Sequence, residues 1–159
     1  MAPRVRNKVQ LAVFLLLTLL VLSFIFSNSL QTAEVSAARS GRLAGLLKAF
    51  FDPNNRLTDG LFDHYVRKAA HFCEFGALGF CLMGLFDSFA AKRKGRQRFA
   101  AFALAAVFAA ADESLQFFSD GRAPRIGDVF IDSAGALCGV CFLLLILWLI
   151  QKRSSMQSR

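Results

Sequence analysis

The chain has 159 residues, of which 55% are hydrophobic, and carries a formal net charge of +8. A soluble domain of this length would expose too much apolar surface, so the composition predicts a membrane protein. The excess of basic residues could indicate nucleic acid, but their distribution along the chain explains the charge without that partner.

The first apolar run covers residues 9–26 and contains no charged residue. It is longer than the ~7–15 residues of a signal-peptide core, so an uncleaved transmembrane helix is predicted. Residues 27–68 read as a long polar connection, within which "RLAGLLKAFF" places Leu43, Leu46, Leu47 and Phe50 on one helical stripe. This stripe is too short to span, which favours an amphipathic helix lying in the membrane interface. The "DPNN" that follows is expected to end it.

Three further spans are predicted, over about residues 69–91, 99–118 and 129–150. Each approaches the ~20 residues that cross the hydrocarbon core. Residues 1–159 therefore read as a single domain, an all-α integral membrane protein. It would be a four-transmembrane-helix bundle with an interfacial amphipathic helix in the first external loop. Four cysteines within apolar runs are expected to be small buried residues: Cys73, Cys81, Cys138 and Cys141.

Basic residues predict the orientation of the bundle. The N-terminal segment, residues 92–98 and the C-terminal tail hold 3, 5 and 3 of the 19 Lys and Arg residues, and none of these segments contains an acid. Basic short loops stay in the cytoplasm, so both termini are expected there. The two remaining connections, which mix acids and bases, would be external.

This orientation places one end of each span on the external side of the membrane. In the last three spans, ionisable residues gather at that external end. Helical spacing puts Arg67, His71 and Glu74 on one stripe, and Asp128 on the same stripe as Asp132. Charges in a bilayer are costly, so they should point inward and pair. The expected cluster comprises His71, Glu74, Asp112, Glu113, Gln116, Asp128 and Asp132, with Arg67, Arg122 and Arg125 balancing the acids.

Glycines accompany these charges on two of the spans. Gly135 and Gly139 continue the stripe of Asp132 and form a small-xxx-small face, which lets a neighbouring helix approach closely. Gly76 and Gly79 are candidates for the same role on the second span.

Three motifs in order resemble the VanZ-like family: "HYVRKAAHFCEFGALG", "ADESLQFF" at 111–118 and "GRAPRIGDVFIDSAG" at 121–135. One departure is Leu115, where the family often has histidine. The family is named for a determinant of tolerance to teicoplanin, a glycopeptide that binds peptidoglycan precursors outside the membrane. The resemblance implies a multi-pass protein of the bacterial cytoplasmic membrane. Its motif positions here are Arg67, Lys68, His71, Glu74, Asp112, Glu113, Gln116, Gly121, Arg122, Asp128 and Asp132.

Three hypotheses for the polar cluster stay open at this point. The first is a pocket that binds or shields an anionic envelope lipid or lipid-linked cell-wall precursor, because Arg67, Lys68, Arg122 and Arg125 suit phosphate recognition. The second is an intramembrane enzyme acting on such a lipid, with His71, Glu74, Asp112 and Glu113 as the acid–base candidates. The third is a charge network that only holds the helices together. Assembly into a homo-oligomer is also left open.

No metal and no other cofactor is expected from the sequence. One histidine with several carboxylates suits a divalent cation. Metal sites in helix bundles, however, use paired Glu-x-x-His motifs, whereas His71 and Glu74 stand alone and in the reverse order.

Overall fold

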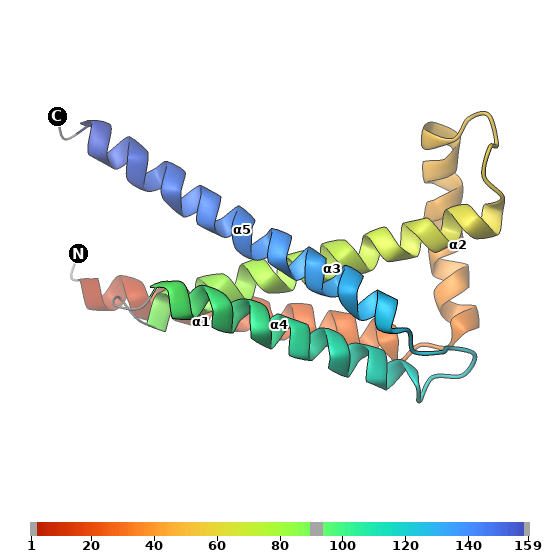
Figure 1. The fold of residues 1–159 in the computed structure, drawn as a ribbon, viewed down its shortest axis with the longest axis horizontal. Helices are drawn as coiled ribbons and strands as arrows, with labels where there is room; N and C mark the ends of the chain where they lie inside the picture. Colours follow the sequence, from red (N-terminus) through yellow and green to blue (C-terminus); the bar gives the residue numbers. More distant parts are fainter. Residues whose placement is uncertain (1–2, 90–93, 158–159) are drawn as a thin grey trace.

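The structure is a computed structural model that describes residues 3–89 and 94–157. Within these residues the chain is helical, without strands. The helices are α1 (Pro3–Ser29), α2 (Ala33–Phe51), α3 (Asp59–Phe89), α4 (Lys94–Gln116) and α5 (Ile126–Gln157). The start of α1 and the end of α5 lie at one end of the bundle, and α2 lies across the other end (Figure 1). This arrangement is the one that an even number of antiparallel spans requires.

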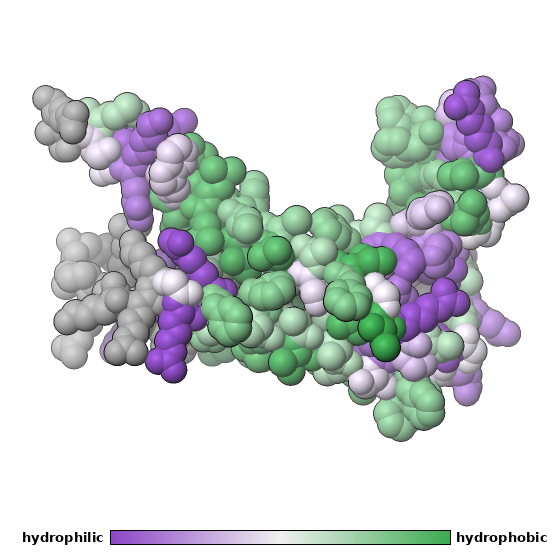
Figure 2. All heavy atoms as spheres, in the orientation of Figure 1, coloured by the Kyte–Doolittle hydropathy of each residue, from purple (hydrophilic) through white to green (hydrophobic). Residues whose placement is uncertain are grey.

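Four helices, all but α2, are long and apolar enough to cross a membrane. Their hydrophobic side chains form a band across the middle of the molecule, with hydrophilic residues gathered at both ends (Figure 2). Many large apolar side chains on this band are exposed, such as Leu20, Val107 and Phe142. In a bilayer these side chains would face lipid. The predicted all-α, four-span membrane architecture is therefore confirmed.

The polar connection predicted over 27–68 contains more helix than expected. The first helix continues to Ser29, and α3 begins at Asp59, well before the predicted start of the span. The basic loop at 92–98 is also shorter than predicted, since α4 begins at Lys94; residues 90–93 lie outside the described part of the chain. At the other end, α5 continues through the tail to Gln157.

The additional helix in the first connection is present as α2, and it is longer than the stripe that predicted it. Thr32 caps its start by accepting a hydrogen bond from the Val35 amide, and it ends at Phe51, where "DPNN" follows. Leu46 and Phe50 are exposed, whereas Ala44 on the opposite side is buried. The exposed apolar face fits a helix that lies on a membrane surface, and its position in the interface stays a prediction.

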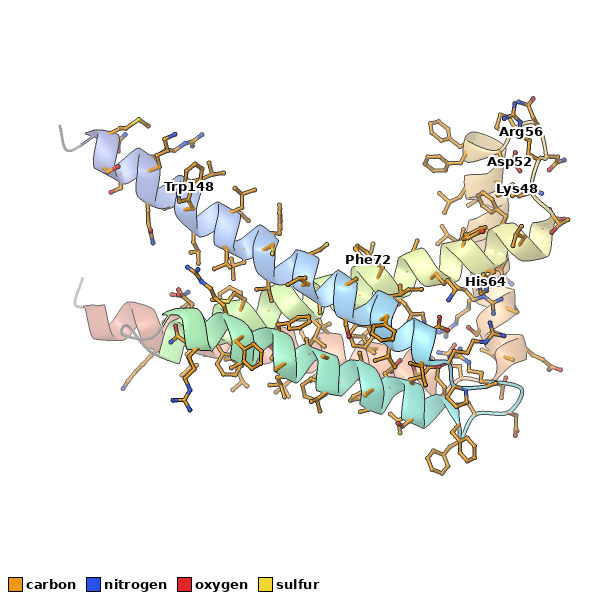
Figure 3. The ribbon with its side chains drawn as sticks, viewed as in Figure 1. Lys48, Asp52, Arg56, His64, Phe72 and Trp148 are labelled. Atoms are coloured by element: carbon orange, nitrogen blue, oxygen red, sulfur yellow. The ribbon has the colours of Figure 1, made fainter. Side chains whose placement is uncertain are left out.

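The connection between α2 and α3 is fixed by charged side chains (Figure 3). The Asp52 carboxylate accepts hydrogen bonds from the backbone amides of Arg56 and Leu57, both at 2.9 Å. Lys48 forms an ion pair with Asp59 at 2.6 Å, which joins the last turn of α2 to the first turn of α3. These contacts hold α2 in place against the start of α3.

The central helix of the bundle is α3, which contacts all four other helices. Its closest neighbour is α5, because glycines, which have no side chain, lie where the two helices cross. A Cβ atom added to Gly135 would overlap the carbonyl oxygen of Phe72, and one added to Gly79 would overlap that of Ala136. The predicted small-residue faces on both helices are therefore confirmed. Phe72 marks this crossing in Figure 3.

The core lies between α1, α3, α4 and α5 and combines large with small side chains. Phe75, Leu78 and Leu82 of α3 are fully or almost fully buried. On α4, three buried alanines at a spacing of four residues form a flat face against them: Ala101, Ala105 and Ala109. This face lets α4 lie close to α3, which brings the polar ends of the two helices together.

The expectation that all four cysteines are buried is wrong for three of them. Cys81 is buried, but Cys73, Cys138 and Cys141 are exposed, and none of the four forms a disulfide. The three exposed thiols lie on helices of the apolar band, where a small hydrophobic side chain tolerates contact with lipid as well as with protein. Apolar surroundings in the sequence therefore did not indicate burial within the protein.

Candidate functional site

The polar cluster centres on three side chains from three helices. His71 lies on α3, Asp112 lies near the end of α4, and Asp132 lies two turns into α5. The Nδ1 atom of His71 is 3.9 Å from Oδ1 of Asp132. One ligand-type atom from each of the three residues lies within 4.8 Å of the other two. The glycine crossing of α3 and α5 is what brings His71 and Asp132 together, because Gly135 contacts Phe72, the neighbour of His71.

The two aspartates at this centre are almost completely enclosed. Asp112 is 0% exposed and Asp132 is 1% exposed. Among the described residues, Oδ1 of Asp112 and both carboxylate oxygens of Asp132 have no hydrogen-bond partner. Asp112 receives one long hydrogen bond, from Nε2 of Gln116 to its Oδ2 at 3.5 Å. Buried carboxylates with free oxygens are costly and mark this site as more than a packing contact.

Three other predicted acids surround this centre, and each has a different partner. Glu74 accepts a hydrogen bond from Asn28 of α1 at 3.4 Å. Glu113 accepts a hydrogen bond from the backbone amide of Arg125, and Asp128 forms an ion pair with Lys68. The structure therefore brings all the predicted acids to one end of the bundle, but only His71, Asp112 and Asp132 converge on one point.

The arginines do not all balance the acids as the sequence suggested. Arg67 pairs with Asp63 on its own helix at 3.1 Å, and its neighbour Lys68 reaches Asp128 instead. Arg122 is partly buried in the loop between α4 and α5, near Asp112 and Glu113. Burial lowers the pKa of its guanidinium, and the two carboxylates oppose that shift. Arg125 is exposed and contributes its backbone amide.

Sequence reasoning missed the contribution of α1 to the site. Asn28 contacts Glu74, and the side chain of Ser29 is completely buried beside Asp112. The carbonyl oxygen of Ser29 accepts a hydrogen bond from the Ser119 hydroxyl at 2.9 Å, which joins α1 to the loop after α4. The available signal was the polar "SNS" directly after an uninterrupted apolar run. Polar residues at this position also fit the start of a loop, which is what the sequence alone predicts.

A cavity of about 630 Å³ opens beside this polar centre, between the end of α4 and the start of α5. Most of its wall is apolar, and Glu113 and Arg125 are its charged residues. It is lined by Ala110, Glu113, Ser114, Phe117, Phe118, Pro124, Arg125, Ile126 and Val129. The cavity is open to the surface, and an open apolar cavity with few charged groups suits an amphiphilic ligand.

Four apolar spans around a centre of one half-buried histidine and two buried carboxylates define a multi-pass α-helical membrane protein with a polar site between its helices. The VanZ/LLP1 family model matches residues 14–150. That range includes α3 and α4, most of α1 and α5, and every residue of the cluster, and the chain belongs to this family. The resemblance seen in the three sequence motifs is thus confirmed. The chain matches no curated protein and no solved structure.

Proposed function

We propose that the protein binds or shields an anionic envelope lipid, or a lipid-linked cell-wall precursor, at the outer leaflet of the bacterial cytoplasmic membrane, and thereby contributes to glycopeptide tolerance. The observation that carries this proposal is the cavity between α4 and α5. Its walls provide apolar surface for a lipid chain, and Arg125 provides a cation for a head group. Such a combination is the one that an amphiphilic anion requires.

The positive charges near the cavity support an anionic head group. Arg125 lines the cavity and is exposed, and Arg122 lies in the same loop. Guanidinium groups form charge-assisted, bidentate contacts with phosphate oxygens. Lys68 and Arg67 already have carboxylate partners, so they are less available for a ligand. We therefore assign recognition of the head group to Arg122 and Arg125.

The proposal is tested with the full chain in nanodiscs and a polyisoprenyl phosphate as the probe. Arg122→Gln and Arg125→Gln should each weaken binding about tenfold or more, because a hydrogen bond to a charged group contributes ~1.5–3 kcal/mol. Arg153→Gln, at the far end of α5, is the matched control and should bind like the wild type. Teicoplanin tolerance of cells expressing each variant should follow the same order. Wild-type affinity in both loop variants would refute the proposal.

A second candidate function is supported by the free oxygens of Asp112 and Asp132. An intramembrane enzyme acting on such a lipid could use His71 and these carboxylates in proton transfer. Glu74 and Glu113 were predicted to be acid–base partners as well, but each now has another partner. The two functions differ in one measurement. If the bound polyisoprenyl phosphate is chemically changed by the wild type but not by His71→Asn, the protein is an enzyme; recovery of the intact lipid favours binding alone.

A further inference from the structure

Three helices present a compact set of metal-ligand side chains inside the bundle. His71 supplies an imidazole nitrogen, and Asp112 and Asp132 each supply a carboxylate oxygen, with all three atoms within 4.8 Å of one another. Atoms that bind one Zn²⁺ ion lie ~2.0–2.2 Å from it, so two such atoms are at most ~4.4 Å apart. Small side-chain rotations would therefore bring these three atoms to one ion.

The two carboxylates lack the partners that a buried charge needs. Asp112 and Asp132 are at most 1% exposed, and three of their four oxygens accept no hydrogen bond from the described residues. In the described part of the chain, no lysine or arginine nitrogen lies within 4.0 Å of either carboxylate. Buried acids in such a setting take up a proton or bind a cation. The convergence with an imidazole favours the cation.

We propose that His71, Asp112 and Asp132 bind one divalent first-row cation, Mn²⁺ or Zn²⁺. Imidazole suits Zn²⁺ and related ions, and carboxylates suit Mn²⁺. Mg²⁺ fits less well because it loses its water reluctantly and prefers all-oxygen ligands. The sequence lacks the paired Glu-x-x-His motifs of metal sites in helix bundles, and for that reason it predicts no metal. A site for a single ion does not need a second motif of this kind. Three protein ligands leave further coordination positions for water or an anion.

Neighbouring residues orient these ligands as second-layer groups do in metal sites. The side-chain amide of Gln116 contacts Oδ2 of Asp112, and Oδ1 has no hydrogen-bond partner among the described residues. Close contact between Gly135 and the Phe72 carbonyl holds the helices of His71 and Asp132 together. Arg122 lies near Asp112 in the adjacent loop, where it could accompany an anion bound to the ion.

Mn²⁺ binding to the full chain in chelator-treated nanodiscs tests the proposal without added polyisoprenyl phosphate. The wild type should bind about one Mn²⁺ per chain and melt roughly 5–10 °C higher when the free ion exceeds its Kd ~100-fold. Pulsed electron paramagnetic resonance should detect a coordinated imidazole nitrogen, and that signal should be lost in His71→Gln. Asp132→Asn should weaken binding at least ~100-fold, because even outer-layer contacts contribute ~10–100-fold to affinity.

A control separates this site from adventitious binding to acidic residues. Glu34→Gln removes an acid in the first turn of α2, outside the three-ligand set and the polar cluster, so it should bind Mn²⁺ like the wild type. Asp132→Asn keeps the shape of the side chain and removes a buried charge, so it should remain folded without metal. Equal binding by all variants, or no Mn²⁺ and no Zn²⁺ bound by the wild type, would overturn the proposal. Because no polyisoprenyl phosphate is added, neither result depends on the proposed function.

Discussion

Gly139 of α5 lies directly against the carbonyl oxygen of Gly76 in α3, so close that a Cβ atom would overlap that oxygen. The obstacle is backbone, which cannot rotate away as a side chain could. Gly139→Ala must therefore push the two helices apart. We expect a loss of about 1–3 kcal/mol in unfolding free energy, as for other overpacked cores, measured as a lower melting temperature in detergent.

The control for this prediction lies on the same helix. Nothing comes within 4 Å of a Cβ added to Gly127, in the first turn of α5. Gly127→Ala should leave stability unchanged or raise it slightly, because alanine favours a helix more than glycine does. Equal melting of Gly139→Ala and the wild type would mean that the helices are further apart than described.

Lys68 and Asp128 form an ion pair between α3 and α5 at the polar end of the bundle. Both side chains are partly exposed, so the pair should contribute only about 1 kcal/mol or less. Lys68→Gln and Asp128→Asn should each lower the melting temperature slightly, and the double variant should lose less than the sum. A double-mutant cycle measures this coupling. Strict additivity would mean that Lys68 is free to bind a ligand, as the sequence alone had suggested.

The number of helices and the glycine faces could be predicted because each depends on a local pattern. An apolar run of about 20 residues predicts a span by itself, and a small residue at every fourth position predicts a close crossing. The first turns of α3 were missed for the opposite reason. Residues 59–68, "DGLFDHYVRK", are too polar to be read as part of a span. These residues nevertheless form the first turns of α3, which extends beyond the apolar band and contacts α2.

The members of the polar cluster could be predicted, but not their pairing. Helical spacing put the ionisable residues at one depth and on defined stripes. Arg67 and Lys68 are adjacent, so they point about 100° apart on the helix, and which of them faces Asp128 depends on the rotation of α3 against α5. That rotation is set by the glycine crossing, which a single sequence does not define. The convergence of His71 with Asp132 depends on the same rotation.

Asp52 should make the connection between α2 and α3 sensitive to acid. Hydrogen bonds from the backbone amides of Leu57 and Arg56 lower the pKa of its carboxyl below the ordinary 3.8. A group whose pKa is lower in the folded state stabilises it above the unfolded pKa, and loses that effect as the pH falls through the folded pKa. The protection of the Arg56 and Leu57 amides against exchange, relative to the intrinsic rate at each pH, should therefore be high at neutral pH and fall below about pH 4.

Asp52→Asn provides the comparison for this pH dependence. The variant should show faster exchange at neutral pH, and its difference from the wild type should shrink as the wild-type carboxyl becomes protonated. Glu34→Gln, in the first turn of α2 and away from this connection, is the control. A difference between Asp52→Asn and the wild type that stays constant down to pH 2 would contradict the role assigned to the charge.

Glu74→Gln separates a functional from a purely structural role for the polar cluster. The amide oxygen of glutamine can still accept the hydrogen bond from Asn28, while the charge near Asp112 is removed. We therefore expect melting at or above the wild-type temperature, because removing a poorly compensated charge in a membrane span is favourable. Asn28→Leu removes the donor and should lower the unfolding free energy by about 1 kcal/mol or more, which is measured as a lower melting temperature. If Glu74→Gln melts like the wild type but loses drug tolerance, the cluster acts on a ligand; if tolerance falls only as stability falls, the charges serve to assemble the bundle.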